Sequence, residues 1–354
     1  MYDFKIYESL SEELKILWSK LEKKSNKNFF QSYDYIKSLV ELENNLLKIV
    51  VVFINNEPVA LFPLEIKKYF IFKVLQWIGT KKSDLCNPMI SQNVDLCKNK
   101  DFFIKTWNNI LAKIGKFDLI FFNNQPEKIQ KTLNPFVDLF KTNSFSKVYQ
   151  IFLPNNYESY INEIKLKDKA HHYELHRTSI KLNKLKENFN VTFVISDTHS
   201  DKIIFKEIIK KKINQLEFKN NKHNLDFTFI KVYENLIKKD KGKYLMFNIK
   251  VNDKIISSCF AIIFENTFYY YIPMLISNEY NNFKPGKILI IKLIKWCFEN
   301  NIKIFDFGLG EEKYKKHFSN YSLNIHKYIH HRNLKGYFLS LILKLLFFYK
   351  TKRL

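Results

Sequence analysis

FYYYIPMLISNEYNNFKPGKILIIKLIKWCFENNIKIFDFGLGEEKYK, residues 268–315, predicts a strand, a loop, a helix, a strand and a glycine-broken turn, in that order. The first strand is rich in aromatic residues and ends near Pro273. A polar loop then leads to Lys284-Pro285-Gly286-Lys287, and an apolar helix follows over residues 288–299. The second strand is expected over residues 302–307. The strand–helix–strand order predicts a sheet covered by helices.

The Pro-Gly pair at the start of this helix predicts a phosphate-binding position. Proline and glycine suit the first turn of a helix, where backbone N–H groups have no intrahelical partner. Such a helix start attracts phosphate through these N–H groups and the helix dipole. Gly286 has no side chain, so a ligand can approach the backbone closely. The alternative is that Pro285 and Gly286 only start a helix.

Length and composition predict a folded chain of two domains. The chain has 354 residues, of which 46% are apolar and 16% aromatic, enough to bury substantial cores. The expected division is residues 1–155, residues 156–333 and a C-terminal tail of residues 334–354. The four cysteines form neither a CxxC pair nor a cluster, so neither zinc nor a disulfide framework is implied.

The net charge of +23 does not by itself indicate a nucleic-acid partner. Only three of the 58 basic residues are arginine, the residue that makes bidentate contacts to phosphates and bases. Abundant Lys, Asn, Ile and Phe with only 7 Gly fit the codon bias of an AT-rich genome. The start of the chain is acidic and helical rather than an apolar signal segment, which predicts a cytoplasmic protein.

The two halves of the chain share a pattern of elements. In the first half, residues 46–69 predict two strands around a turn at residues 55–58, a further strand is expected over residues 70–78, and a helix over residues 101–114. In the second half, turns at residues 252–253 and 265–266 predict a three-stranded antiparallel meander. The strand–helix–strand stretch follows it, so the order of elements indicates a structural duplication.

A charged segment separates the halves, and its histidines do not predict a metal site. Residues 156–190 predict a long helix or a helix pair. His172 and His176 share a helix face with His171 close by, but no Glu or Asp completes a recognisable metal motif. We therefore expect no bound metal.

The tail contains an apolar run of about 13 residues interrupted by Lys344, too short to span a bilayer. It is apolar nearly all round, with basic residues at both ends. This composition fits an interfacial helix on anionic lipid at the inner face of the membrane, or a helix that docks on the fold or on a partner. Both alternatives remain open from the sequence.

The motifs together resemble a known family. The meander, the Pro-Gly helix start and the turn Phe305-Asp306-Phe307-Gly308-Leu309-Gly310-Glu311-Glu312-Lys313-Tyr314-Lys315 are similar to those of GNAT-like N-acyltransferases of the CelD-like (cellulose-biosynthesis type) family, which is related to the Fem-type aminoacyltransferases. In the first half, Phe30-Gln31-Ser32, the strand ending VALFPLEI, and Ser83-Asp84 followed by Asn87-Pro88 also resemble that family. The likeness covers most of residues 28–330.

The resemblance implies an α/β (α+β) fold of two tandem GNAT-like lobes, each a mixed, mostly antiparallel sheet flanked by helices. It also implies acyl transfer from acetyl-CoA or another acyl-CoA to a primary amine. Pyrophosphate would lie at Pro285, Gly286, Lys287 and Ile288, and pantetheine beside the strand that contains Met274. The family's usual glycine-rich loop is reduced here to Pro285-Gly286.

Three residues are implied for the chemistry. Asp306 and Glu312 are candidates to accept the amine proton, and Tyr314 is a candidate to protonate the leaving thiolate. A turn-forming Asp that bonds nearby backbone amides, and a core Tyr, are the alternatives. Lys315 would hold a phosphate or a sugar-nucleotide diphosphate, and Ser83, Asp84 and Asn87 would line the acceptor pocket, although turn chemistry also explains the last three.

These residues predict an acyltransferase for an amino sugar, a nucleotide-sugar or a glycan or lipid precursor in polysaccharide biosynthesis. One alternative is a Fem-type transferase that uses aminoacyl-tRNA, with the Lys-rich helix near residues 160–188 holding the tRNA. Another is a non-catalytic tether in a surface-glycan assembly complex. A nucleophilic hydrolase is not indicated, since neither GxSxG nor a suited Cys/His pair occurs.

Overall fold

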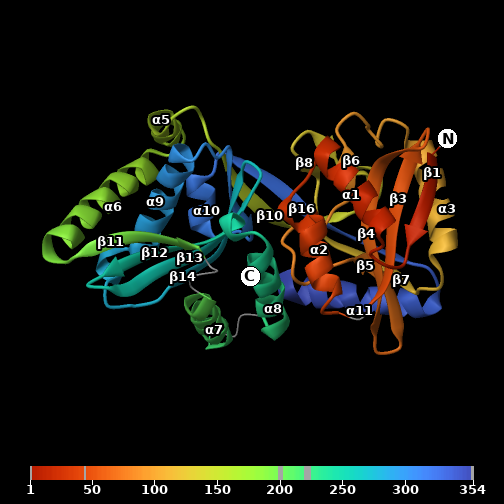
Figure 1. The fold of residues 1–354 in the computed structure, drawn as a ribbon. Coiled ribbons are helices and arrows are strands. Elements are labelled where there is room, and N and C mark those ends of the chain that lie inside the picture. Colours follow the sequence, from red (N-terminus) through yellow and green to blue (C-terminus); the bar gives the residue numbers. More distant parts are fainter. Residues whose placement is uncertain (1, 44, 198–201, 219–224, 352–354) are drawn as a thin grey trace. The chain divides into compact units, whose positions relative to one another are not determined.

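The computed structural model describes residues 2–43, 45–197, 202–218 and 225–351 (Figure 1). The chain forms two compact units: unit 1 contains Met1–Ser146 and Leu323–Leu354, and unit 2 contains Lys147–Ser322. The end of the chain thus returns to the unit in which the chain began. The predicted domains, with boundaries after residues 155 and 333, stay predictions.

Unit 1 is built on a mixed sheet with the strand order β1-β3-β4-β5-β7-β16. All neighbouring pairs are antiparallel except β5 and β7, which are parallel. Helix α3 lies between these two strands in the sequence, so β5, α3 and β7 form a crossover. The strands are β1 (Tyr2–Tyr7), β3 (Leu46–Ile54), β4 (Glu57–Tyr69), β5 (Phe72–Trp77), β7 (Leu119–Pro126) and β16 (Tyr321–His331).

Helices and short strands complete unit 1, and large aromatic side chains fill its core. Trp77, Trp107 and Phe136 are buried against one another, with ring centroids 4.8 Å apart for Trp107 and Phe136. The helices are α1 (Glu12–Lys24), α2 (Tyr33–Val40), α3 (Lys100–Ile114), α4 (Pro135–Asp138), α11 (Leu334–Thr351) and the 3-10 turn η1 (Phe29–Gln31). The short strands are β2 (Ser25–Asn26), β6 (Met89–Ser91), β8 (Lys128–Ile129) and β9 (Thr132–Leu133).

The prediction of a strand over residues 70–78 is wrong at its start. Phe70 lies in the turn between β4 and β5 with φ +53°, and β5 begins at Phe72. Sequence pattern favoured a strand because Phe and Ile are strand-forming residues. The turn predicted near Asn55 and Asn56 is confirmed, with φ +49° and +64° at these residues, a conformation that asparagine tolerates.

In unit 2 the strand order is β10-β15-β14-β13-β12-β11, again with mixed pairing. Only β14 and β15 are parallel, and helix α9 connects them. The predicted meander is confirmed by the antiparallel β12–β13 and β13–β14 pairs. The strands are β10 (Asn143–Phe152), β11 (Val191–Asp197), β12 (Tyr244–Val251), β13 (Lys254–Phe264), β14 (Thr267–Leu275) and β15 (Ile304–Leu309).

The helices of unit 2 include the predicted pair in the charged segment. Asp168 ends the first helix and caps the second, since its side chain accepts a hydrogen bond from the His171 N–H at 2.9 Å. The helices are α5 (Tyr157–Lys167), α6 (Lys169–Asn188), α7 (Lys202–Phe218), α8 (Phe227–Lys239), α9 (Pro285–Glu299), α10 (Lys313–Phe318) and the 3-10 turns η2 (Lys241–Lys243) and η3 (Asn281–Phe283).

Both units therefore have the expected architecture, a mixed and mostly antiparallel sheet flanked by helices. Each contains a hairpin, then a strand, a helix and a second strand, and these last two strands are parallel: β5 and β7 in unit 1, β14 and β15 in unit 2. The strand expected over residues 302–307 is β15, which begins two residues later at Ile304, because the N–H groups of Lys303 and Ile304 bond the Asn266 carbonyl at 2.9 and 3.1 Å. Among the described residues, no helix has the length and hydropathy to cross a membrane.

Candidate functional site: the diverging strands and helix start of unit 2

The two parallel strands of unit 2 pair over a short distance and then diverge. The β14–β15 ladder joins Thr267, Phe268 and Tyr269 to Ile304, Phe305 and Asp306, and it ends there. By contrast, the β13–β14 ladder continues to Leu275. Strand β14 therefore continues beyond its last pair with β15. A divergence of this kind leaves a place where an extended ligand can add along the strand by β-augmentation.

Helix α9 follows β14 after a loop that contains η3, and its first turn lacks a side-chain cap. Lys284 at the N-cap is in the left-handed conformation with φ +55°, and Pro285 is the first helical residue. The N–H groups of Lys287 and Ile288, two of the expected phosphate donors, bond the Lys284 carbonyl at 3.0 and 3.2 Å. A Cβ on Gly286 would meet open space. The start of the helix is thus accessible at Gly286, as a phosphate seat requires.

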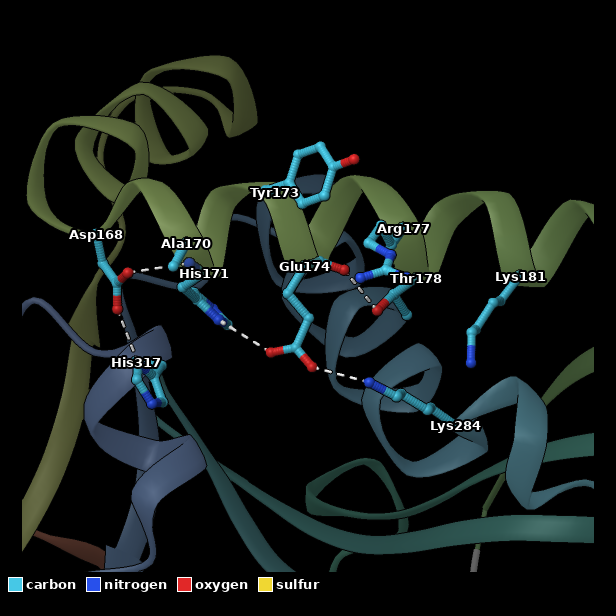
Figure 2. A pocket seen from close by; sticks show the side chains of 10 residues that line it. All are labelled: Asp168, Ala170, His171, Tyr173, Glu174, Arg177, Thr178, Lys181, Lys284 and His317. Atoms are coloured by element: carbon cyan, nitrogen blue, oxygen red, sulfur yellow. Dashed lines mark hydrogen bonds and ion pairs between the residues drawn. The ribbon is translucent and has the colours of Figure 1, made fainter.

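A hollow of about 320 Å³ adjoins the α9 start (Figure 2). Helix α6 supplies most of its wall, the α9 N-cap supplies Lys284, and α10 supplies His317. The lining residues are Asp168, Ala170, His171, Tyr173, Glu174, Arg177, Thr178, Lys181, Lys284 and His317. Arg177, Lys181 and Lys284 make it a place where an anion can bind.

Glu174 occupies the lysines at the start of α9. Its Oε1 accepts hydrogen bonds from Lys284 Nζ at 3.0 Å and from Lys287 Nζ. Figure 2 shows Glu174 extending from α6 toward Lys284. Hydrogen bonding to Lys287 and Lys284 lowers the pKa of Glu174 to about 2, so this side chain is a carboxylate at neutral pH. A phosphate bound at the helix start would compete with the Glu174 carboxylate for the ammonium groups of Lys284 and Lys287.

Two stacked histidines form the other end of the hollow. His317 Nδ1 lies 2.8 Å from Asp168 Oδ2, and the His171 and His317 rings stack with centroids 5.3 Å apart. His171 is 4% exposed, and neither of its ring nitrogens has a hydrogen-bond partner. Burial lowers the pKa of His171 to about 4, which keeps the ring neutral. Among the described residues, no group of three or more His, Cys, Asp or Glu can hold a metal ion.

Asp306 is buried where the two parallel strands separate. Its Oδ1 accepts a hydrogen bond from the Gly308 N–H at 2.7 Å, and its Oδ2 accepts one from Gln150 Nε2 at 2.6 Å. The bond to Gly308 is the contact that the turn-forming alternative expects. The position at the divergence is what a catalytic role expects. Its role as proton acceptor stays a prediction.

The turn after β15 is held together by two of the predicted residues. Lys315 Nζ is buried, donates to the Leu309 carbonyl at 2.9 Å and pairs with Glu312 Oε2 at 2.9 Å. Gly310 lies under this pair with φ +127°, where a Cβ would be 2.5 Å from Glu312 Oε2. Lys315 and Glu312 therefore have a structural contact in the absence of any substrate. Their proposed roles stay predictions.

Tyr314 lies on helix α10, which follows β15, and Met274 lies on β14 beyond its last pair with β15. The Tyr314 ring contacts Phe307 edge to face with centroids 6.1 Å apart, and burial raises the pKa of its hydroxyl above the usual value. The phenol is therefore protonated at neutral pH. Met274 is buried on β14, and the preceding carbonyl of Pro273 accepts a hydrogen bond from Lys212 Nζ on α7 at 2.8 Å. Helix α7 thus contacts the extended part of β14.

The predicted acceptor residues lie in a loop of unit 1 and bond within that unit. Ser83 Oγ donates to the Tyr35 hydroxyl at 3.2 Å, and Asn87 Oδ1 accepts from Asn28 Nδ2 at 2.8 Å. Gln31 Nε2 donates to the carbonyls of Asn87 and Pro88 at 3.0 and 2.7 Å, so the Phe30-Gln31-Ser32 and Asn87-Pro88 motifs form one contact. Asp84 is partly buried in the same loop. A role in an acceptor pocket stays a prediction for Ser83, Asp84 and Asn87.

Sequence reasoning missed the side chains of the hollow. Glu174, Arg177 and His317 were passed over because their partners lie on other elements, far away in sequence. One signal was present: a Glu on a long basic helix and a pair of lysines flanking Pro-Gly are natural ion partners. The stacking of His171 on His317 had no signal in the sequence.

Comparisons with known proteins show what this chain is similar to. Residues 175–316 match the acetyltransferase (GNAT) domain family. Among curated proteins, none matches this sequence. The solved structure of FemX is similar over 93% of this chain and 97% of its own, with 13% sequence identity and a TM-score of 0.60.

Two further solved structures share the fold. L-PGS from Bacillus licheniformis is similar over 96% of this chain and 98% of its own, with 10% identity and a TM-score of 0.50. A tandem GNAT protein from the clavulanic acid biosynthesis pathway is similar over 94% and 98%, with 7% identity and a TM-score of 0.50. At these identities the likeness concerns the fold alone, and the resemblance to the CelD-like family stays a prediction. Residues 175–316 thus match the GNAT acetyltransferase domain family, and the chain shares the fold of FemX and of a tandem GNAT protein.

Proposed function

We propose that this chain is an acyl-CoA-dependent N-acyltransferase that transfers an acetyl or other acyl group to a primary amine. The acceptor class we propose is an amino sugar, a nucleotide-sugar or a glycan or lipid precursor. The observation that carries the proposal is the β14–β15 ladder, which ends after three residue pairs, together with the helix start without a side-chain cap that follows β14 after a loop, within the segment that matches the GNAT domain family.

The donor would lie along this divergence. Gly286 offers an open backbone position for pyrophosphate beside Pro285, Lys287 and Ile288, and the free run of β14 near Met274 offers an edge for the pantetheine amides. The cationic side chains of the hollow, Arg177, Lys181 and Lys284, supply further anion contacts. The carbonyl carbon of a thioester donor is the atom that an amine attacks.

The chain's own residues would then handle the protons. The amine nitrogen attacks the thioester carbon, the C–S bond breaks, one proton leaves the nitrogen and one joins the thiolate sulfur. Asp306 or Glu312 would take the first proton, either directly or through water. Tyr314, whose pKa is raised by burial, would hold the second proton as a neutral phenol until the thiolate leaves. Lys315 would contact the acceptor's phosphate.

A second candidate is a Fem-type transfer from aminoacyl-tRNA. One observation favours it: the 20-residue helix α6 exposes His176, Arg177, Lys184 and Lys186, a basic surface long enough to contact a nucleic-acid backbone. Glu174 would in that case hold Lys284 and Lys287 permanently, rather than yield them to a phosphate of CoA.

Calorimetric titration of the full chain with acetyl-CoA and with longer acyl-CoAs tests the proposal. We expect saturable binding to the full chain and no measurable binding to Gly286→Glu, whose carboxylate would enter the open space at the helix start. Gly242→Glu is the matched control, because Gly242 is exposed elsewhere in unit 2 and the same charge there should leave binding unchanged.

The same titration separates the alternatives. No binding of any acyl-CoA, together with tight and salt-sensitive tRNA binding, would contradict the proposal and favour Fem-type transfer. Binding of neither ligand would favour a non-catalytic tether.

A further inference from the structure

Helix α11 rests on unit 1 with small residues and exposes large ones. Gly336 and Ser340, four residues apart, are buried, and a Cβ on Gly336 would lie 1.8 Å from the Asp118 carbonyl oxygen. Among the residues of α11 whose side chains are described, the large apolar ones that remain exposed are Leu334, Tyr337, Phe338, Leu341, Ile342, Leu345 and Leu346. Docking on the fold, one of the two expectations for the tail, is thus met by the face that contains Gly336 and Ser340, with Leu339 and Leu343 partly buried beside them. The large apolar face is left to solvent.

The hairpin tip between β4 and β5 adds a second exposed apolar element. Phe70 is 93% exposed and has φ +53°, and Ile71 is 67% exposed. The left-handed conformation disfavours a bulky residue. Two other hairpin turns contain Asn55-Asn56 and Asn252-Asp253, the residue types that this geometry favours, and two more have the polar residues Gln130 and Glu265 in this conformation. Neither backbone conformation nor packing explains a Phe-Ile pair at this tip.

A basic hollow of about 440 Å³ joins the tip to the start of α11. It is lined by Ile71 of the tip and by the cationic residues Lys73, Lys116, Arg332 and Lys335. The single carboxylate there, Asp118, already accepts hydrogen bonds from the Lys73 N–H and from Asn333 Nδ2, both at 2.8 Å. Arg332 is fixed by bonds to the Leu111 and Gly115 carbonyls. The hollow therefore carries an excess of positive charge beside apolar residues.

We propose that this apolar-basic face of unit 1, formed by the α11 row, the Phe70–Ile71 tip and the basic hollow, docks on the surface of an anionic lipid bilayer. Such a surface offers acyl chains for the apolar row and phosphate groups for the cations at once. The residues 334–346 of α11 form a stretch about 20 Å long, the size of an interfacial helix that lies along a membrane rather than across it. The single acidic side chain that lines the hollow, Asp118, is partly exposed and is hydrogen-bonded within unit 1, and four cationic residues surround it.

Flotation of the full chain with vesicles tests this inference. We compare phosphatidylcholine vesicles with and without phosphatidylglycerol. The wild type should float with the anionic vesicles and only weakly with the neutral ones. Phe338→Glu combined with Leu345→Glu should weaken binding roughly 30-fold, because both side chains are exposed and would otherwise enter the acyl region.

Two further variants separate apolar from electrostatic contacts. Phe70→Asn should preserve the hairpin, since Asn suits its turn, and should lower vesicle binding several-fold. Lys73→Glu with Lys335→Glu should weaken binding to anionic vesicles and leave the weak binding to neutral ones unchanged. Thermal unfolding confirms that each variant is folded.

Leu166→Glu is the matched control, because Leu166 is 87% exposed in unit 2, and this variant should bind as the wild type does. Equal flotation of the wild type and the Phe338→Glu, Leu345→Glu variant would overturn the inference. So would the absence of flotation with anionic vesicles, or a concentration-dependent dimer that the same variant abolishes, since a second copy of the chain would then cover the face.

Discussion

The crossovers of the two units differ in what occupies the point where their parallel strands separate. In unit 1, Asn124 beyond the short β5–β7 ladder donates to the Ser83 carbonyl at 2.8 Å, and its own carbonyl accepts from the Cys86 N–H at 2.8 Å. The loop between β5 and β6 is thus bonded to β7. In unit 2, Gly286 borders open space, and a hollow adjoins the helix start. A duplicated arrangement is closed by its own loop in one copy and accessible to a ligand in the other.

The helix starts of the two crossovers also differ, because a side chain caps one of them and not the other. Helix α3 of unit 1 has Asn99 as its N-cap, whose side chain accepts from the Phe102 N–H at 3.3 Å. Helix α9 of unit 2 has no side-chain cap, and its N-cap Lys284 is in the left-handed conformation. A side-chain cap satisfies the donors that would bind an anion. The comparison therefore favours unit 2 for the proposed ligand binding and a structural role for the crossover of unit 1.

The largest effect is expected from the carboxylate at the divergence of unit 2. Asp306→Asn should lower turnover about 100- to 1,000-fold while acyl-CoA affinity changes little, if Asp306 accepts the amine proton. Steady-state kinetics and calorimetry on the same samples measure both quantities. Asp118→Asn, a change at a carboxylate of unit 1, should leave turnover unchanged.

Unchanged turnover in Asp306→Asn would show that Asp306 does not accept the amine proton. A loss of stability without a loss of turnover would assign it to the turn, where it bonds Gly308 and Gln150.

The next effect concerns a buried carboxylate of unit 1. Burial raises the pKa of Glu65 to about 7, and its partners Gln76 and Asn45 are neutral. Because the folded pKa lies above the unfolded one, the folded state holds this proton more tightly, and the stability it contributes is lost as pH rises from about 4 through about 7. In the wild type, Glu65 should lower the free energy of unfolding by an amount on the order of 2–3 kcal/mol over this pH range. In Glu65→Gln this decrease should be absent.

Denaturant titrations across this pH range measure the effect, and turnover should not change. Parallel pH profiles of the wild type and Glu65→Gln would show that Glu65 titrates normally. A loss of turnover in Glu65→Gln would show that unit 1 takes part in the reaction, and would contradict the difference between the two units.

Asn124→Ala should destabilise the closed crossover of unit 1. It removes a buried hydrogen bond and leaves alanine with φ +55°, for a total of about 2 kcal/mol. The midpoint of urea unfolding measures this loss. Acyl-CoA affinity should stay within about twofold of the wild type, and a larger fall in affinity would mean that unit 1 also binds the donor.

The smallest effect is expected from Glu174 in unit 2. Glu174→Gln should raise acyl-CoA affinity about fivefold, because Lys284 and Lys287 then lose a competing carboxylate. Calorimetry measures the change, with the exposed Glu158→Gln on α5 as the control. A weaker affinity would instead show that Glu174 holds the lysines in position for the ligand.

Local patterns predicted much of this fold. The meander turns at Asn252-Asp253 and Glu265-Asn266 and the Pro-Gly helix start each follow from the preferences of a few neighbouring residues. The start of β5 at Phe72 was missed because strand-forming residues occupy a turn at Phe70 and Ile71. The return of β16 to β7 joins residues about 200 positions apart, which no local pattern shows.

The candidate site was predictable only in part. Gly286 and Asp306 stand in recognisable local motifs. The contact of Glu174 with Lys284 depends on how α6 packs beside α9, and so does the hollow around His171. Such contacts between elements depend on tertiary packing, which overrides what each segment shows alone.

Hydrogen–deuterium exchange of the full chain, with and without a non-hydrolysable acetyl-CoA analogue, tests the central claim most directly. The claim is that the diverging strands and the helix start of unit 2 bind the acyl donor and that the crossover of unit 1 does not. We predict slower exchange in residues 270–288 and unchanged exchange in residues 79–88. Slower exchange in residues 79–88, or none in residues 270–288 when the analogue is bound, would contradict it.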